Sequence, residues 1–397
     1  MLSILAYHKT TVEYFKQKKA VWDFFSNHIH REEQLKEFKT ELLKNTYKFD
    51  EDADKQLYEK VALAKEKLNL TMPVTLYQAQ HTEEMNASIS YVGGEAQIVF
   101  SGRILQLLDE DEIQAIIGHE LSHILLYTQL DSEVEVADRI ISAIANNATS
   151  TPAHYETARL FKLYTEIFCD RGSYAVTGNY GSIISSLVKI STGLQSVNAD
   201  SYIKQAEEIF TSENATKTAG ISHPENFIRA RAIWLWHTKR NDAEDTINQM
   251  IEGFANIEEL DIFRQLQIST ITEQLIQLLL KPEWMQTPKN IALGKQYFGE
   301  LKFGLNARID TELESKIENL YGNLHDYFGY VLYDFATADK TLEDVPLGYC
   351  FHLADMLKLD KAFATTIKKE QKLTDKKVTA LKKQSISAYQ VSSVVNN

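Results

Sequence analysis

Two histidines and a glutamate lie close together in the apolar run IIGHELSH (116–123). His119 and His123 are four residues apart, so on a helix they project from the same face and can each give a nitrogen to one zinc ion at about 2 Å. Glu120 is turned about 100° from His119, where it can take a proton from a water on the metal without binding the metal itself. The spacing predicts a zinc-hydrolase site. Three fixed residues in five also recur by chance, as surface histidines on an ordinary helix.

A catalytic zinc ion needs a third protein ligand, and Glu166 is the candidate, 47 positions after His119. Asp170 follows Glu166 on the same helical face, where it can accept a hydrogen bond from the outer nitrogen of a zinc-bound histidine. Cys169 lies between them and could also bind zinc, but we interpret it as a small buried side chain. Without the upstream motif, Glu166 and Asp170 would indicate only a solvated helix face.

Local patterns indicate which elements must position these residues. Asp109 with Glu112 three positions later is a capping pattern, and helical spacing of apolar residues continues through the motif. Strand-forming segments around the hairpin signal Gly93-Gly94 predict a small sheet just upstream. These strands are expected at residues 73–79, 86–92 and 95–100. Further helices are expected at residues 11–44, 55–68, 131–146 and 153–177.

The composition limits the classes of protein that the chain can belong to. It has 44% hydrophobic and 24% charged residues, and only 16 Gly and 6 Pro in 397 residues, which favours helices over many short strands. The net charge of −13 argues against nucleic-acid binding. No segment approaches the roughly 20 apolar residues of a membrane span. Two cysteines and no export signal predict a cytoplasmic protein without a disulfide framework.

The length predicts two or three domains. We expect an N-terminal helical segment over residues 1–54, a zinc metallopeptidase domain over 55–240 and an all-helical domain over 241–397. The fold class is predicted to be α+β and mostly helical, with a small sheet in the domain that holds the motif.

Three separated segments together resemble the gluzincin metallopeptidases of the HtpX and CAAX-prenyl-protease type. They are NASISYVGGEAQIVFSGRILQLLDEDEIQAIIGHELSHI (86–124), EIFCDRGSYAV (166–176) and SHPENFIRARAI (222–233). The resemblance covers roughly residues 55–240 and implies a zincin-like endopeptidase with an active-site helix, a glutamate-bearing helix and a sheet whose edge receives substrate. It implies one zinc ion bound by His119, His123 and Glu166, Glu120 as general base, and Asp170 as the aspartate of the second-helix motif.

The resemblance gives three further residues a role. Asn86 matches the asparagine that begins the substrate-lining segment, and His223 matches a histidine that helps to hold substrate or the developing oxyanion. Arg229 matches an arginine that supports the site. Taken by themselves, Asn86 is also explained as a turn residue, His223 as a loop histidine and Arg229 as a helix-surface charge.

The sequence departs from the many family members that are integral membrane proteins, because charged residues in 131–146 prevent that segment from spanning a bilayer. We therefore expect an endopeptidase with no membrane span that acts on peptides or unfolded proteins. The alternative is a catalytically weak, zinc-bound protein of the same fold, acting as a binding or regulatory module that recruits a protein partner through its C-terminal helices. The intact Glu120 favours the enzyme.

Overall fold

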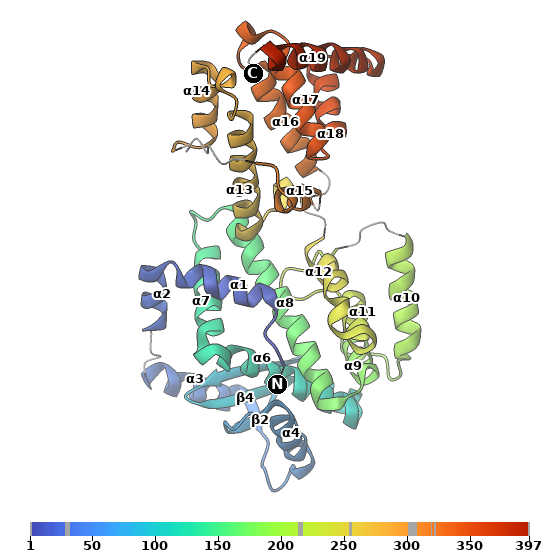
Figure 1. The fold of residues 1–397 in the computed structure, drawn as a ribbon. Coiled ribbons are helices and arrows are strands. Elements are labelled where there is room, and N and C mark those ends of the chain that lie inside the picture. The colour runs from blue at the N-terminus through green and yellow to red at the C-terminus, as the bar shows by residue number, and fades with distance from the viewer. Residues whose placement is uncertain are drawn as a thin grey trace. The chain divides into compact units, whose positions relative to one another are not determined.

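The computed structural model describes residues 2–27, 32–212, 217–253, 256–300, 308–318, 320 and 323–395. The chain forms two compact units, residues 1–253 and 254–397, whose elements are labelled in Figure 1. The first unit combines helices with one sheet, and the described part of the second is helical. The predicted α+β, mostly helical class is confirmed. The division into residues 1–54, 55–240 and 241–397 stays a prediction.

The sheet of the first unit has four strands in the order β1-β2-β4-β3. Strands β2 and β4 pair in parallel, while β1 pairs antiparallel with β2 and β3 antiparallel with β4. Gly93 and Gly94 join β3 to β4 with positive φ angles of 66° and 79°, as the hairpin signal predicted. Strand β3 therefore lies at one edge of the sheet. The bounds are β1 Thr46–Lys48, β2 Val74–Ala79, β3 Asn86–Val92 and β4 Glu95–Ser101.

The helix predicted over residues 11–44 is wrong, because the chain forms separate helices there. The run KQKK (16–19) has no apolar side chain to extend the buried face of the first helix, which includes Val12 and Phe15. Residues 28–31 lie outside the described part of the chain. The predicted helix over 55–68 is present. The bounds are α1 Ala6–Lys16, α2 Lys19–Ser26, α3 Glu32–Asn45 and α4 Lys55–Leu68.

Two long helices, α6 (Glu110–Thr128) and α8 (Pro152–Thr177), pack closely at the centre of the first unit. The predicted cap of α6 is present. The Asp109 side chain accepts a hydrogen bond from the backbone N–H of Glu112, and the Glu112 side chain accepts one from the backbone N–H of Asp109. Helix α8 has Pro152 in its first turn and ends at Gly178 with φ 68°. The other helices of the unit are α5 Ile104–Leu107, α7 Glu133–Ala145, α9 Tyr180–Thr192, α10 Ala199–Ser212, α11 Asn226–Lys239 and α12 Glu244–Glu252, with 3-10 turns at Gln129–Ser132 and Arg240–Ala243.

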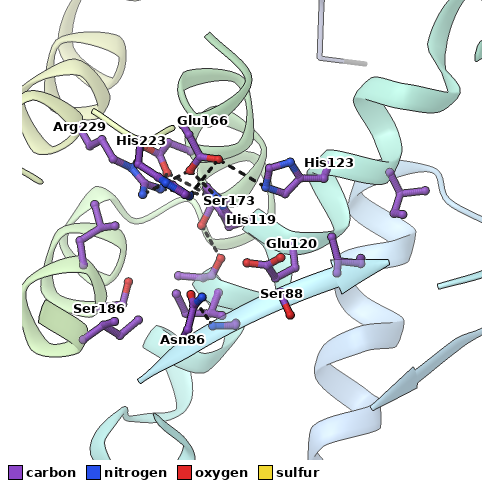
Figure 2. Close-up of a pocket in the computed structure, with 18 of the residues that line it drawn as sticks. Asn86, Ser88, His119, Glu120, His123, Glu166, Ser173, Ser186, His223 and Arg229 are labelled. Atoms are coloured by element: carbon purple, nitrogen blue, oxygen red, sulfur yellow. Dashed lines mark hydrogen bonds and ion pairs between the residues drawn. The ribbon is translucent and has the colours of Figure 1, made fainter. Parts of the chain in front are cut away.

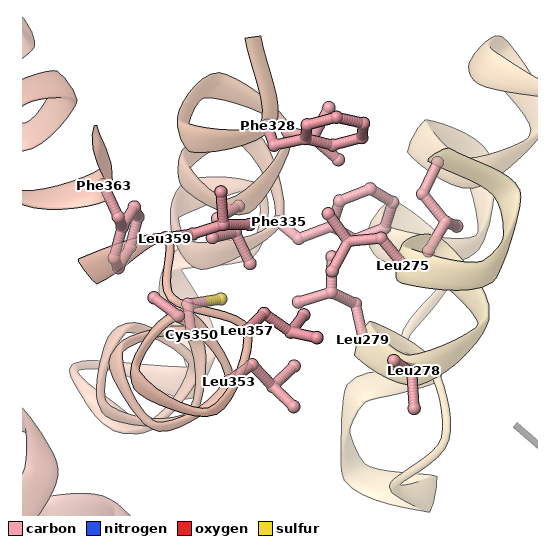
Figure 3. Close-up of a cluster of buried hydrophobic side chains, with 14 of the residues drawn as sticks. Leu275, Leu278, Leu279, Phe328, Phe335, Cys350, Leu353, Leu357, Leu359 and Phe363 are labelled. Carbon is pink, nitrogen blue, oxygen red and sulfur yellow. The ribbon is translucent and has the colours of Figure 1, made fainter. Parts of the chain in front are cut away.

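The second unit is built around its own apolar core (Figure 3). Leu275 and Leu279 of α13 pack with Phe328 and Phe335 of α16, and Cys350 of α17 is buried in the same cluster. The helices are α13 Ile262–Leu279, α14 Pro288–Tyr297, α15 Thr311–Glu318, α16 Asn323–Thr337, α17 Val345–Met356, α18 Asp360–Glu370 and α19 Asp375–Val395, with 3-10 turns at Ile257–Glu259, Glu283–Met285 and Lys340–Leu342. In the described parts of both units, every helix is too short or too polar to cross a membrane.

Candidate metal centre and substrate cleft

Helix α6 presents the three residues of the predicted zinc motif. His119 and Glu120 are buried, and the imidazole centroids of His119 and His123 lie 5.2 Å apart, as expected for positions i and i+4. Figure 2 shows the Glu120 carboxylate on the side of the imidazoles that faces strand β3. The helix therefore turns two nitrogens and one carboxylate toward the same space.

Helix α8 brings Glu166 to the two histidines (Figure 2). Its Oε2 lies 3.4 Å from His119 Nε2, and its Oε1 lies 3.8 Å from His123 Nε2. The two helices approach closely because glycines face the neighbouring helix: Gly118 of α6 lies against Val176, and Gly172 of α8 lies against Ser122. The structure thus brings together the three residues predicted to bind zinc, although Glu166 lies 47 positions after His119 in the sequence.

The donor atoms fit a divalent cation. Glu166 Oε2 is buried and lies 3.4 Å from both His119 Nε2 and Arg229 Nη1, with a geometry too poor for a hydrogen bond, so it keeps lone pairs that a metal ion could use. Burial by itself would lower the pKa of His119, but its hydrogen bonds to Asp170 and Glu166 and the charge of Glu166 raise that pKa to about 10. The field that holds a proton on His119 would also attract a metal ion. Two imidazoles and a carboxylate are a ligand set typical of catalytic zinc.

The other histidine is held in the form that can bind a metal. Burial, followed by the positive charge of His119, lowers the pKa of His123 to about 4, so its imidazole is neutral near pH 7. A neutral imidazole has a free nitrogen lone pair to give to a metal.

Asp170 and Arg229 position the His119 imidazole from its Nδ1 side. Asp170 Oδ1 lies 3.0 Å from His119 Nδ1, and the Arg229 guanidinium donates to both Asp170 oxygens at 2.6 and 2.9 Å. Burial would raise the pKa of Asp170, but the charge of Arg229 keeps it below its usual value. The ionised carboxylate can therefore accept from Nδ1, which directs Nε2 toward Glu166. Arg229 is buried, so the simpler interpretation of it as a helix-surface charge does not hold.

Glu120 has different electrostatics from Glu166. Burial, opposed by the positive charges of His119 and Arg229, raises the pKa of Glu120 to about 7. The pKa of Glu166 is well below its usual value: burial would raise it, but hydrogen bonding to His119 and the charge of Arg229 lower it. Two carboxylates with separated pKa values are typical of sites in which one holds charge and the other transfers protons.

Cys169 is also near the histidines, since one nitrogen of each and its Sγ lie within 4.8 Å of one another. We nevertheless favour Glu166 as the third ligand. Cys169 is fully buried outside the lining of the cleft. Burial and then the charges of Glu166 and Glu120 raise the pKa of its thiol well above the usual value. Forming the thiolate that a zinc ligand requires would therefore be costly.

A cleft of about 1140 Å³ runs over these residues. Its lining includes residues of β3 and of helices α6, α7, α8, α9 and α11. All eight predicted site residues lie in it: Asn86, His119, Glu120, His123, Glu166, Asp170, His223 and Arg229. Asn86 begins strand β3 at the cleft rim. The His223 side chain is 61% exposed, and its Nε2 lies 3.6 Å from Glu166 Oε1.

The sequence reasoning missed the contribution of helix α9 to this cleft. Ile183, Leu187 and Ile190 line it, at spacings of four and three residues that would have indicated an apolar helix face. It also missed a buried ion pair that ties α9 to the start of α6: Lys189 Nζ lies 2.8 Å from Glu112 Oε2. The partners are 77 residues apart, so no local pattern pointed to it.

Comparison with known families agrees with this geometry. Residues 51–236 match the model of peptidase family M48. This part of the chain is therefore similar to M48 peptidases. The matched residues contain the predicted zinc ligands, Glu120 and strand β3 of the cleft rim.

A relative of the M48 domain is the plastoglobule-localized metallopeptidase 48, chloroplastic, of Arabidopsis thaliana. The two are 26% identical, over 44% of this chain and 54% of the relative, so the chain spans about half the length of the curated protein that it matches. No solved structure matches the chain significantly.

Proposed function

We propose that the first unit is a zinc-dependent endopeptidase in which His119, His123 and Glu166 bind one zinc ion and Glu120 is the general base. The observation that carries this proposal is the convergence of two imidazole nitrogens on one buried carboxylate, inside a cleft bordered by a free strand edge. The resemblance to the HtpX and CAAX-prenyl-protease type, and a cytoplasmic location, stay predictions.

The substrate would bind as an added strand. An extended peptide can pair with the free backbone groups of β3, at the sheet edge that borders the cleft. Asn86, at the start of β3, would hold the peptide backbone at one end of this edge. Most extended segments of a folded protein are already paired within its own sheets, so we expect peptides and unfolded chains as substrates.

A bound zinc ion would supply Lewis acidity, which lowers the pKa of a water molecule and polarises the scissile carbonyl. Glu120 would take the proton from the attacking water and pass it to the leaving amine. Because burial raises the pKa of Glu120 to about 7, its carboxyl group can both accept and return a proton near neutral pH.

The remaining residues would position these groups. Asp170 would fix the orientation of His119, and Arg229 would hold Asp170 through its two short hydrogen bonds. His223 would donate a hydrogen bond to the substrate or to the developing oxyanion, since its side chain is largely exposed at the cleft.

The decisive test compares the native chain with Glu120→Gln, measuring zinc content and cleavage of unfolded casein. We expect both proteins to hold one zinc ion per chain and cleavage to fall by about 10²- to 10⁴-fold in the variant. Glu110→Gln is a matched control on the same helix, because the Glu110 side chain is 71% exposed; it should cleave like the native chain.

Two results would contradict the proposal. Native protein that holds no zinc after purification with added zinc would exclude the metal site. Equal zinc in both proteins, with neither cleaving casein or a panel of other unfolded proteins, would favour the alternative: a catalytically weak module that binds a partner through the helices of the second unit.

A further inference from the structure

One wall of the cleft is apolar and is formed mainly by helix α9. Ile183, Leu187 and Ile190 lie on one face of α9 and line the cleft together with Ile116 of α6, while Ser186 and Ser191 of α9 line it beside them. Ile183 and Leu187 are also part of a buried apolar cluster, whereas Ile190 is only partly buried. The wall is therefore the edge of the apolar core where it meets the cleft. A substrate side chain placed against this wall would lose contact with water.

The opposite end of the cleft is polar. There it is lined by Tyr127, Thr128, Ser132, Glu135, Asp138 and Arg139. The apolar and polar ends of the cleft lie on opposite sides of the predicted zinc site along helix α6, because Ile116 comes one turn before His119 and Tyr127 one turn after His123. In Figure 2, Ser186 of α9 and Asn86 of β3 lie on one side of Glu120 and His123 lies on the other. A bound peptide would meet apolar side chains on one side of the scissile bond and polar groups on the other.

The apolar wall is held firmly in place. Lys189 of α9 pairs with Glu112 of α6, and both side chains are buried. The Asn226 amide donates to the Leu187 carbonyl and to Ser191 Oγ, at 3.1 and 3.0 Å. Helix α9 is thus tied to the helix of the zinc motif on one side and to the start of α11 on the other. A wall tied at two points keeps its shape before substrate arrives, and such preorganisation favours selective binding.

We infer that the α9 wall is a specificity subsite that takes one bulky apolar side chain, such as leucine or phenylalanine, beside the scissile bond. The inference rests on the proposed peptidase function and names its substrate class. Strand β3 spans about 17 Å from Asn86 to Tyr91, at roughly 3.3 Å per residue, which accommodates about five residues of extended peptide. The preferred substrate is an unfolded segment of that length with an apolar residue at one fixed position.

The test uses dodecapeptides of Ala, Ser, Gly and Lys with one central guest residue: Leu, Phe, Ala or Asp. The zinc-loaded full chain is incubated with each, kcat/KM is measured, and the cut is located by mass spectrometry. We expect Leu and Phe guests to be cleaved at least about tenfold better than Ala or Asp guests. The cut should fall at a constant position next to the guest.

Two variants tie this preference to the wall. Ile190→Asp should remove the advantage of the Leu guest, and Leu187→Phe, an apolar replacement that narrows the subsite, should reduce cleavage of the Phe guest more than of the Ala guest. The matched control is Leu194→Asp, because Leu194 is 54% exposed and lies outside the cleft lining. The control should keep the native preference.

The outcomes separate the inference from the function on which it rests. If all four guests are cleaved equally, or if neither α9 variant alters the preference, the subsite does not lie on α9 and the inference is overturned while the peptidase proposal stands. If the native chain cleaves neither the peptides nor casein, the peptidase proposal fails and the inference fails with it.

Discussion

Replacing Gly172 by alanine tests whether the metal ligands depend on the close approach of α6 and α8. A Cβ atom on Gly172 would lie 1.9 Å from Ser122 Oγ and 2.6 Å from Ser122 Cβ. The hydroxyl can rotate away, but the Ser122 Cβ moves only with the backbone of α6. Ordinary contact begins near 3.4 Å, so relieving the 2.6 Å contact requires the helices to separate by about 0.8 Å.

This separation should affect both stability and metal binding. Overpacking of a close helix contact costs about 1–3 kcal/mol of unfolding free energy. Ser122 adjoins His123, and Gly172 is six residues from Glu166, so the same movement widens the gap of 3.8 Å between His123 Nε2 and Glu166 Oε1. Because displacements near 1 Å disrupt a site, we expect zinc affinity to fall by about 10- to 100-fold.

The assay is competition for zinc with a colorimetric chelator, alongside denaturant unfolding of the zinc-free protein. A double variant, Gly172→Ala with Ser122→Gly, removes both clashing atoms, and the next atom near the new methyl group is then Leu2 Cδ2 at 3.7 Å. Zinc affinity should recover to within a few-fold of native. The reasoning is refuted if the single variant binds zinc like the native chain, or if the double variant is no better than the single one.

Three further predictions concern buried titratable side chains. Burial lowers the pKa of His8 to about 3, so the imidazole stays neutral in the folded chain, whereas in the unfolded chain it binds a proton below about pH 6.5. The unfolding free energy therefore has its full value above pH 6.5 and declines as the pH falls toward 3. Lowering the pH from 7.5 to 5.5 should therefore reduce the unfolding free energy of the native chain by about 1.4 kcal/mol more than that of His8→Leu, as measured by denaturant unfolding. Equal reductions in the two proteins would contradict this prediction. Arg229→Gln leaves Asp170 buried without its cation and should cost about 3–5 kcal/mol in thermal or denaturant unfolding, while an unchanged midpoint would show that the pair is dispensable. Lys189→Met should also cost about 3–5 kcal/mol of unfolding free energy, because it leaves the buried Glu112 carboxylate without its cation. Adding Glu112→Leu should restore only part of this loss, since the second change also removes the Glu112 carboxylate that caps α6 at Asp109. A double variant as unstable as the single one would exclude the ion pair as the cause.

The common helix face of His119 and His123 could be predicted because its information is local. The i, i+4 spacing of His119 and His123 fixes their common face, and the capping pattern at Asp109 places them inside a helix. The hairpin at Gly93-Gly94 was predictable for the same reason, since positive φ angles at two neighbouring positions favour glycine.

The sequence could not specify features that depend on distant partners. The buried pair of Glu112 and Lys189 looks in sequence like two surface charges, and α9 gives no sign of which element its apolar face meets. The expected helix over 11–44 failed because helical spacing alone does not reveal where a buried face ends. Parallel pairing of β2 with β4, which leaves β3 at the cleft edge, also depends on tertiary packing.

The charge balance of the site gives a physical reason to expect a cation there. Glu166 and Asp170 are buried carboxylates held below their usual pKa, and Arg229 is the buried guanidinium beside them. The group therefore carries one excess negative charge, which a proton on His119 balances in the protein alone and a divalent ion would more than balance. Glu120 differs from these groups, since burial raises its pKa to about 7 and its carboxyl group is therefore partly protonated near neutral pH. A purely structural ion cluster would gain nothing from a third buried carboxyl group facing the cleft, and a leucine at this position would avoid the cost of burying it. A carboxyl group at that position is consistent with the proposed proton transfer to and from a substrate.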